Sequence, residues 1–412
     1  MKWQAPGPGT WERDLAHFDR SVSPIMVDLM ETAAPRGIRE GFDLTGAPLD
    51  TMDIRFVNGQ MYRRLVPIIG GGGRAPSTPP PAWVVRAVFA VHPRLRRRVR
   101  TASSAMANKQ WNDEADRWER TWKPELIETN RRLASFDVIA ATSPELADHL
   151  VETLDHVDRA MVLHFRLHIS DLGPIALLLD HADDWGLDPA RVMSALAGAS
   201  PATTAPRDAL RPLARELDSV AATPSSLDEV RGASERAAAL LDDYLVEFGS
   251  RLTTGYDVTD LTLAELPDLI LASLSDARLL DSTTAAEEAV VRGDAALAAL
   301  RDEVPITERE LFDDVVGDAR RLYGLRDENG PITAEWPCGV LRNGLLEAGG
   351  RLVAAGRLHV VDHVFDLDGV EVVGVLRGEP GPRADAVATR HRTRLARADG
   401  DSPPHLGADP VE

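Results

Sequence analysis

The chain has 412 residues, 44% of them hydrophobic, and a formal net charge of −19 at pH 7. This length predicts two or three domains with a large apolar core, and the negative charge argues against nucleic acid or a membrane surface as a partner. The single cysteine, Cys338, excludes an internal disulfide and a cluster of thiolate ligands. No apolar run approaches the roughly 20 residues that span a bilayer, and the N-terminus lacks a signal-peptide stretch, so we expect a cytoplasmic protein.

The first 75 residues are predicted to form an N-terminal segment around one β-hairpin. Ser23 precedes Pro24, and a capping serine followed by proline at the first helical position is typical of a helix start. Asn58-Gly59 then separates two stretches of β-forming residues, which is the strongest short-range signal for a hairpin. We therefore expect a hairpin near residues 53–65.

Residues 82–378 show the apolar periodicity of helices and are predicted to form one multi-helix region. Trp111, Trp118 and Trp122 recur at spacings of seven and four, which places them on one face of a helix. The expected fold is therefore mainly α, with the hairpin as a small β element. Residues 379–412 are charged and poor in large apolar side chains, so we expect a disordered tail or a severed linker there.

One basic run lies in this acidic sequence, between Arg94 and Arg100. Two interpretations remain open for it. The run can be a solvated helix face, or it can be a docking patch for an acidic partner domain.

Motifs spread over the chain carry a family resemblance. The C-terminal half contains Arg321-Leu-Tyr-Gly-Leu-Arg326, Gly339-Val-Leu-Arg342, Leu345-Leu346-Glu347-Ala-Gly349-Gly350-Arg351-Leu352, Gly356-Arg357-Leu358 and Asp362-His363-Val364-Phe365. Earlier segments are Gly7-Pro8-Gly9-Thr10-Trp11-Glu12, Ser21-Val22-Ser23-Pro24, Gly255-Tyr256-Asp257 and Glu265-Leu266-Pro267. Taken together, this series resembles the phosphoenolpyruvate-synthase-like, or "PEP-utilising", proteins and the rifampin phosphotransferases.

The resemblance implies an acceptor-binding region from which two catalytic domains are missing. In such families an ATP-grasp domain charges a histidine on a swivelling domain, which then carries the phosphoryl group to an acceptor on a helical domain. The sequence contains neither a phosphate-binding GxxxxGK[ST] motif nor a Gly-Gly-x-x-[ST]-His motif. The implied partners are therefore an ATP-grasp protein, a phosphohistidine swivelling-domain protein and a small hydroxylated organic substrate. ATP and Mg²⁺ would act through the partner domains, with no cofactor bound directly.

Three histidines are candidate catalytic residues: His164, His168 and His181. The first two are four residues apart, so they share one face of a helix. One of them can be a general base for the acceptor hydroxyl, because the pKa of histidine lies near working pH. The pair can also bind a divalent ion, although position 165 lacks the glutamate of an HExxH site and no metal site is predicted. In a third interpretation, hydrogen bonds inside a helical bundle satisfy these histidines.

The candidate substrate-binding residues fall into two groups. Guanidinium groups bind phosphate or carboxylate through two hydrogen bonds, and aromatic rings can wall a pocket. Salt bridges to nearby carboxylates, and core packing of the tryptophans, are the competing interpretations. The candidates are Arg166, Asp180, Asp184 and Trp185 near the histidines, and Arg321, Arg326, Arg342 and Trp336 in the C-terminal motifs.

These features predict one function and leave two alternatives. We expect the acceptor-binding component of a multi-part, ATP-dependent dikinase-type phosphotransferase that acts on a hydroxylated small molecule in a biosynthetic pathway. The first alternative is a free-standing acid–base or lyase-type enzyme that uses the histidines without ATP. The second is a non-catalytic scaffold.

Overall fold

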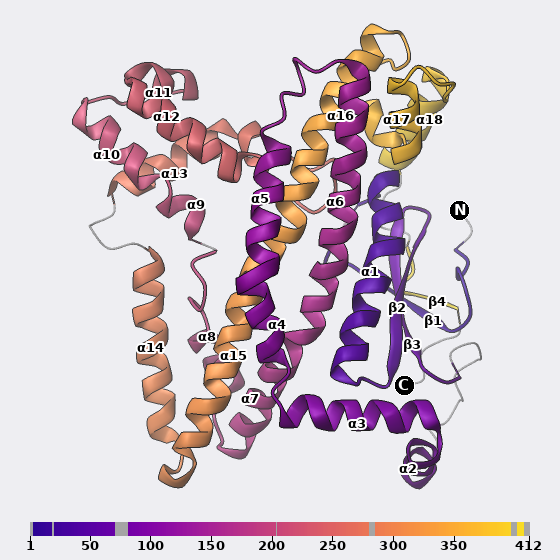
Figure 1. Cartoon of the computed structure of the whole chain (residues 1–412), viewed down its shortest axis with the longest axis vertical. Helices are drawn as coiled ribbons and strands as arrows, with labels where there is room; N and C mark the ends of the chain where they lie inside the picture. Colours follow the sequence, from indigo (N-terminus) through magenta and orange to yellow (C-terminus); the bar gives the residue numbers. More distant parts are fainter. Residues whose placement is uncertain are drawn as a thin grey trace.

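The computed structural model describes residues 3–18, 20–70, 81–202, 204–279, 285–396 and 402–407. Helices account for 69% of the structure, which confirms the predicted mainly α fold. Figure 1 shows long helices running along the longest axis of the molecule, with α1 beside α6. These helices are α1 (Pro24–Thr45), α5 (Lys123–Ala134), α6 (Ser143–Ser170), α15 (Arg309–Gly330) and α16 (Trp336–Ala354).

Helices α1 and α6 pack closely. The Ser23 side chain accepts a hydrogen bond from the Met26 backbone N–H, so α1 begins at the predicted cap. A Cβ added to Gly37 of α1 would lie 2.1 Å from the carbonyl oxygen of Val162 on α6, so only glycine allows this approach. The shared core with α16 includes Ile25, Met26, Leu29, Leu150, Val157, Leu341 and Leu345.

Helices α15 and α16 are joined by a π-helical turn, η5 (Pro331–Glu335). Such turns leave backbone carbonyls without regular helical partners. Here Asn130 of α5 donates to the Ile332 carbonyl oxygen at 2.9 Å, and Thr333 donates to that of Asn329. A second π-helical turn, η1 (Trp118–Trp122), lies in the predicted tryptophan stripe, where Trp111 and Trp118 are buried in one core.

The predicted hairpin forms, with longer strands than expected. Strands β2 (Leu49–Val57) and β3 (Gln60–Pro67) are antiparallel, and Val57 pairs with Gln60 across the turn. Asn58 and Gly59 have φ values of 52° and 83°, as a two-residue type I′ turn requires. The hairpin belongs to an antiparallel sheet of order β2-β3-β1-β4, completed by β1 (Thr10–Arg13) and β4 (His405–Gly407).

The predicted disordered tail is wrong for the described part of residues 379–412. Helix α18 (Ala384–Leu395) packs against η6 (Val361–Asp366), and β4 pairs with β1. Two charged residues of α18 have partners on other elements: Arg394 makes a buried ion pair with Asp366, and Arg390 pairs with Glu371. Val387 and Leu406 supply the buried apolar contacts.

The remaining helices surround the bundle in Figure 1. They are α2 (Ala82–Val91), α3 (Pro93–Ala107), α4 (Trp111–Arg117), α7 (Leu172–Asp184), α8 (Pro189–Ala195), α9 (Ala205–Asp208), α10 (Arg211–Ser219), α11 (Leu227–Ala233), α12 (Glu235–Tyr244), η2 (Leu245–Gly249), η3 (Leu263–Glu265), α13 (Pro267–Leu279), α14 (Ala285–Glu303), η4 (Ile306–Glu308) and α17 (Gly369–Leu376).

One stretch, Ser143–Asp184 with α6 and α7, is long and apolar enough to cross a membrane by length and composition alone. In the structure it packs against α1, α15 and α16. Arg166, in its middle, makes ion pairs with Glu114 and Glu40. These contacts are consistent with a core helix of a soluble protein.

Candidate functional site

The predicted histidine pair on α6 lies against the π-helical turn η5. His164 Nδ1 is 2.9 Å from Thr333 Oγ1, and Asn329 Nδ2 donates to the His164 carbonyl oxygen at 3.0 Å. The His168 ring meets the His164 ring edge-on, with 4.5 Å between centroids. Burial lowers the pKa of His164 well below its usual value, and the neighbouring His168 lowers it further. A base this weak is poorly matched to proton abstraction near neutral pH.

The same pair has few further groups to bind a metal. His168 Nδ1 lies 3.5 Å from Asp171 Oδ2, a distance that fits an ion pair. Across the described ranges, no group of three or more His, Cys, Asp or Glu side chains is arranged as a metal site. The contacts of His164 are those expected if hydrogen bonds satisfy it inside the bundle.

His181 lies away from this pair, at the C-terminal end of α7. Its ring stacks on Trp185, with 5.4 Å between centroids and 19° between planes. Trp185 donates from Nε1 to Glu308 Oε2 at 2.5 Å. Asp180 and Asp184 are exposed on the same helix. This group therefore forms a surface feature of its own.

Most of the predicted substrate-binding residues elsewhere have structural partners. Arg166 donates to both carboxylate oxygens of buried Glu114 at 2.9 and 3.0 Å. Arg321 pairs with Asp116. Trp336 is fully buried, whereas Arg326 is exposed. The structure does not bring these residues together with the histidines into one site.

Arg342 also has structural partners, but in addition it lines a cavity of about 500 Å³. We call this cavity the arginine pocket. Its walls come from the segment before α1, the loop before η3, α16, η6 and α18. The lining residues are Arg20, Ser21, Thr259, Leu261, Arg342, Asp362, Phe365, His391, Arg394 and Leu395.

A carboxylate outside the lining fixes Arg342. Its Nε and Nη2 donate to the two Glu265 oxygens at 2.8 and 2.9 Å, and Nη1 donates to the Val258 carbonyl oxygen. Although burial alone would raise it, hydrogen bonds from Arg342 and Thr262 keep the pKa of Glu265 below its usual value. The guanidinium also lies over the Phe365 ring, 5.0 Å from its centroid. Arg342 is thereby a fixed cation in the pocket wall.

Asp366 fixes two more lining residues from α18. Arg394 donates from Nε and Nη2 to its two oxygens at 2.8 and 3.0 Å. His391 Nδ1 lies 2.8 Å from Asp366 Oδ2. Because a carboxylate only accepts hydrogen bonds, Nδ1 is the ring nitrogen that donates, and in the neutral ring Nε2 is left to accept a proton. A histidine oriented by a buried aspartate is a common general base.

A buried carboxylate joins the N-terminal segment to the loop that lines the pocket. Asp257 accepts hydrogen bonds from the Ser23 backbone N–H and hydroxyl at 2.8 and 2.6 Å, and from Thr259 at 3.1 Å. Burial raises the pKa of Asp257 despite these bonds. Nearby, Arg20 pairs with Asp260.

Guanidinium groups at the arginine pocket keep N–H groups for a ligand. Arg394 donates to Asp366 through Nε and Nη2, and among the described residues its Nη1 has no hydrogen-bond partner. Arg20 is about half exposed, at 52%. With a single carboxylate in the lining, Asp362, this cavity suits an anionic group.

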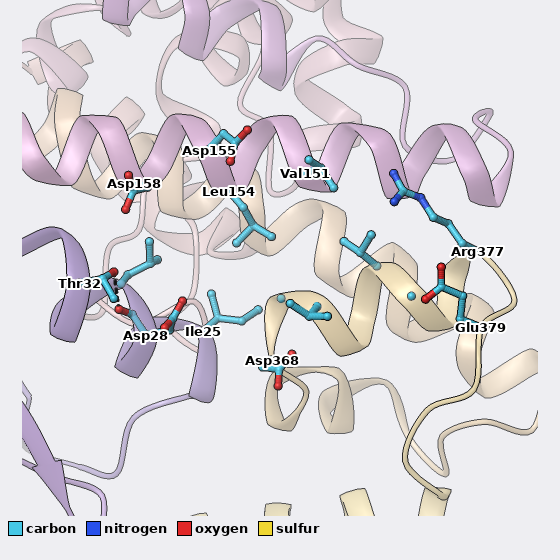
Figure 2. A pocket seen from close by; sticks show the side chains of 15 residues that line it. Ile25, Asp28, Thr32, Val151, Leu154, Asp155, Asp158, Asp368, Arg377 and Glu379 are labelled. Carbon is cyan, nitrogen blue, oxygen red and sulfur yellow. Dashed lines mark hydrogen bonds between the residues drawn. The ribbon is translucent and has the colours of Figure 1, made fainter.

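A larger pocket, of about 650 Å³, lies between α1, α6 and α17 (Figure 2). Ile25 and Leu154 contribute to its apolar floor, and Arg377 stands at one end. Its rim carries Asp28, Asp155, Asp158, Asp368 and Glu379. These carboxylates would repel a phosphoryl group, so volume alone does not make it the better candidate.

Three of the segments quoted for the resemblance contribute residues to the lining of the arginine pocket. Ser21, Arg342, Asp362 and Phe365 belong to the motifs themselves, and Thr259 follows Gly255-Tyr256-Asp257. Sequence reasoning missed Arg20, His391 and Arg394. Only the basic character of α18 could have indicated the last two.

The chain was compared with known families and with curated proteins. No family model matches it, and no curated protein is significantly similar.

Proposed function

We propose that this chain is the acceptor-binding component of a multi-part, ATP-dependent dikinase-type phosphotransferase that acts on a small hydroxylated organic molecule. The observation that carries the proposal is the arginine pocket with its His391–Asp366 pair. Its volume of about 500 Å³ is within the range of small-molecule sites. Three of the motifs that resemble the PEP-utilising proteins contribute lining residues: Ser21, Arg342, and Asp362 with Phe365.

Each lining group has a role in the proposed transfer. The acceptor hydroxyl gives its proton to His391 Nε2 while its oxygen forms a bond to phosphorus. The bond between phosphorus and the phosphohistidine nitrogen of a partner domain breaks. Arg342 and Arg394 stabilise the charge on the phosphoryl oxygens, since this reaction depends mainly on positioning and electrostatics. ATP and Mg²⁺ are bound by an ATP-grasp partner, and we place the assembly in the cytoplasm.

The test is a reconstituted reaction. The chain is combined with ATP-grasp and swivelling-domain proteins, and acceptor-dependent ATP consumption is measured. We expect His391→Ala to lower the rate by roughly 10²- to 10⁴-fold, the usual contribution of a general base. His164→Ala is the matched control, and its rate per folded molecule should be unchanged. If the two variants behave in the opposite way, the assignment of the site is wrong.

The His391–Asp366 pair also favours a second function, an acid–base or lyase-type reaction without nucleotide. A histidine base and adjacent arginines can remove a proton next to a carboxylate of the substrate. The same assay separates the two functions. Conversion of a candidate acceptor by this chain alone, without ATP and partners, would support the second function and exclude the first.

A further inference from the structure

Positive charge is concentrated in one part of this acidic molecule. Between residues 54 and 112 the sequence contains ten arginines, one lysine and no acidic residue. Six of the arginines lie in residues 82–107, which form α2 and α3. We call these two helices the basic arm. The net charge of −19 therefore does not describe the surface that this arm presents.

The basic arm also exposes apolar side chains. On α2, Trp83 is 72% exposed, Val91 76% and Val88 38%. Helix α2 packs on α3, and Figure 1 shows it beyond α3 at the lower end of the molecule. An isolated exposed valine needs no explanation, but a tryptophan and several valines on one short helix indicate a surface that a partner covers.

Helix α3 holds the arm firmly against the body. Leu95 is buried, and Arg98 pairs with Asp43 and donates to the Phe42 carbonyl oxygen. A Cβ on Gly46, just after α1, would lie 2.3 Å from the backbone nitrogen of Ala102. These contacts hold α3 in a fixed orientation, and α2 packs on α3.

The outward face of α3 is cationic. At 100° per residue, Arg96, Arg97 and Arg100 lie opposite buried Leu95 and half-buried Arg98. All three are exposed, and no carboxylate of the described chain pairs with them. Charge and apolar surface thus occur together at the same end of the molecule.

We propose that the basic arm is a peripheral docking surface for an anionic lipid bilayer. Here the exposed arginines of α3 lie beside the Trp and Val side chains of α2, and basic and apolar side chains together are typical of helices that lie in the membrane interface. Tryptophan favours the boundary between headgroups and acyl chains. A nucleic acid would pair with the arginines but would leave Trp83, Val88 and Val91 in water. Acidic groups of the body that lie more than about 8 Å from the lipid are largely screened at physiological salt.

The test measures co-sedimentation of the whole protein with lipid vesicles. Vesicles of phosphatidylcholine with phosphatidylglycerol are compared with vesicles of phosphatidylcholine alone. We expect binding to the anionic vesicles only, and weaker binding as salt is raised. The triple variant Arg96→Glu, Arg97→Glu, Arg100→Glu should bind about 100-fold more weakly. Val88→Asp should also weaken binding, because it places a charge in the apolar contact.

A matched triple variant controls for total charge. Arg215→Glu, Arg236→Glu and Arg292→Glu change the net charge by the same amount at exposed positions outside the arm, and this protein should bind like the wild type. Loss of binding in both triple variants would overturn the proposal, as would absence of wild-type binding to anionic vesicles. Self-association that only the arm variant abolishes, without vesicle binding, would assign the arm to a second copy instead.

Discussion

The histidine cluster on α6 and the arginine pocket hold similar kinds of side chain but are built differently. His164 and His168 come from one helix and meet a turn packed against it. The pocket collects residues from five segments of the chain, from Arg20 to Leu395. In the cluster, His164 pairs with Thr333 of η5, and Asn329 donates to the His164 carbonyl oxygen. In the pocket, Glu265 fixes Arg342 and Asp366 fixes Arg394. Other N–H groups of these two arginines remain at the cavity. Proximity of reactive residues in sequence therefore says little about their access to a ligand.

The largest expected effect is on the ion pair that orders the pocket. Asp366→Ala leaves Arg394 buried, with 8% exposure, and without its carboxylate. Breaking a buried pair in this way costs about 3–5 kcal/mol. We expect the free energy of unfolding, measured by urea denaturation, to fall by about that amount.

The control for this prediction is a carboxylate on α18, the helix that carries Arg394. Asp385 lies 2.8 Å from His359 and is 94% exposed, and exposed pairs contribute little. Asp385→Ala should therefore unfold almost like the wild type. Equal stability of the two variants would show that Asp366 does not hold the pocket together. It would also contradict the orientation of His391, which was assigned from its contact with Asp366.

The next effect is a loss of folding stability in acid, and it comes from another histidine of α6. Burial, with the charges of Arg159 and Arg132, lowers the pKa of His156 from 6.5 to about 4. Between these values the unfolded chain binds a proton that the folded chain excludes, so stability falls as pH decreases from 6.5 to 4. The loss from His156 is up to about 3 kcal/mol, since one pKa unit corresponds to about 1.4 kcal/mol.

His156→Gln isolates this contribution. Asn130 Nδ2 donates to the Ile332 carbonyl oxygen, so its Oδ1 accepts from His156 Nε2, and glutamine can supply the same donor. Urea denaturation from pH 7 to pH 4 should therefore show a smaller loss of stability in the variant, because the carboxylates titrate in both proteins. Parallel stability curves would mean that His156 does not stay neutral in the fold.

Local signals predicted the parts of the fold that local physics determines. The Asn58-Gly59 turn formed because both residues adopt the positive φ values that a tight hairpin needs. The Ser23 cap formed because its side chain accepts a hydrogen bond from the Met26 backbone N–H, only three residues along the chain. The tail was mispredicted because its order depends on Asp366, which holds Arg394 and His391 from a different element. Composition shows that a segment is charged, but not whether its charges will find partners.

The site was predictable only in part for the same reason. Arg321 and Arg342 are equally good anion ligands in the sequence, yet Arg321 pairs with Asp116 on α4 while Arg342 reaches a cavity wall. That difference is decided by which helix packs opposite each residue. No periodicity or spacing contains this information.

The smallest expected effect is the most direct test of the structural role assigned to the α6 cluster. Thr333 is fully buried, and its hydroxyl oxygen lies 2.9 Å from His164 Nδ1. Thr333→Val keeps the shape but leaves that nitrogen unpaired, which costs about 1–2 kcal/mol. Urea denaturation should show this loss, whereas Thr129→Val, at an exposed hydroxyl on α5, should show almost none. The rate of the reconstituted reaction per folded molecule should be unchanged in both variants, because the cluster supports η5 and does not contact the acceptor. If the Thr333→Val protein were fully stable but inactive, the result would instead indicate that the active site lies at the α6 histidines.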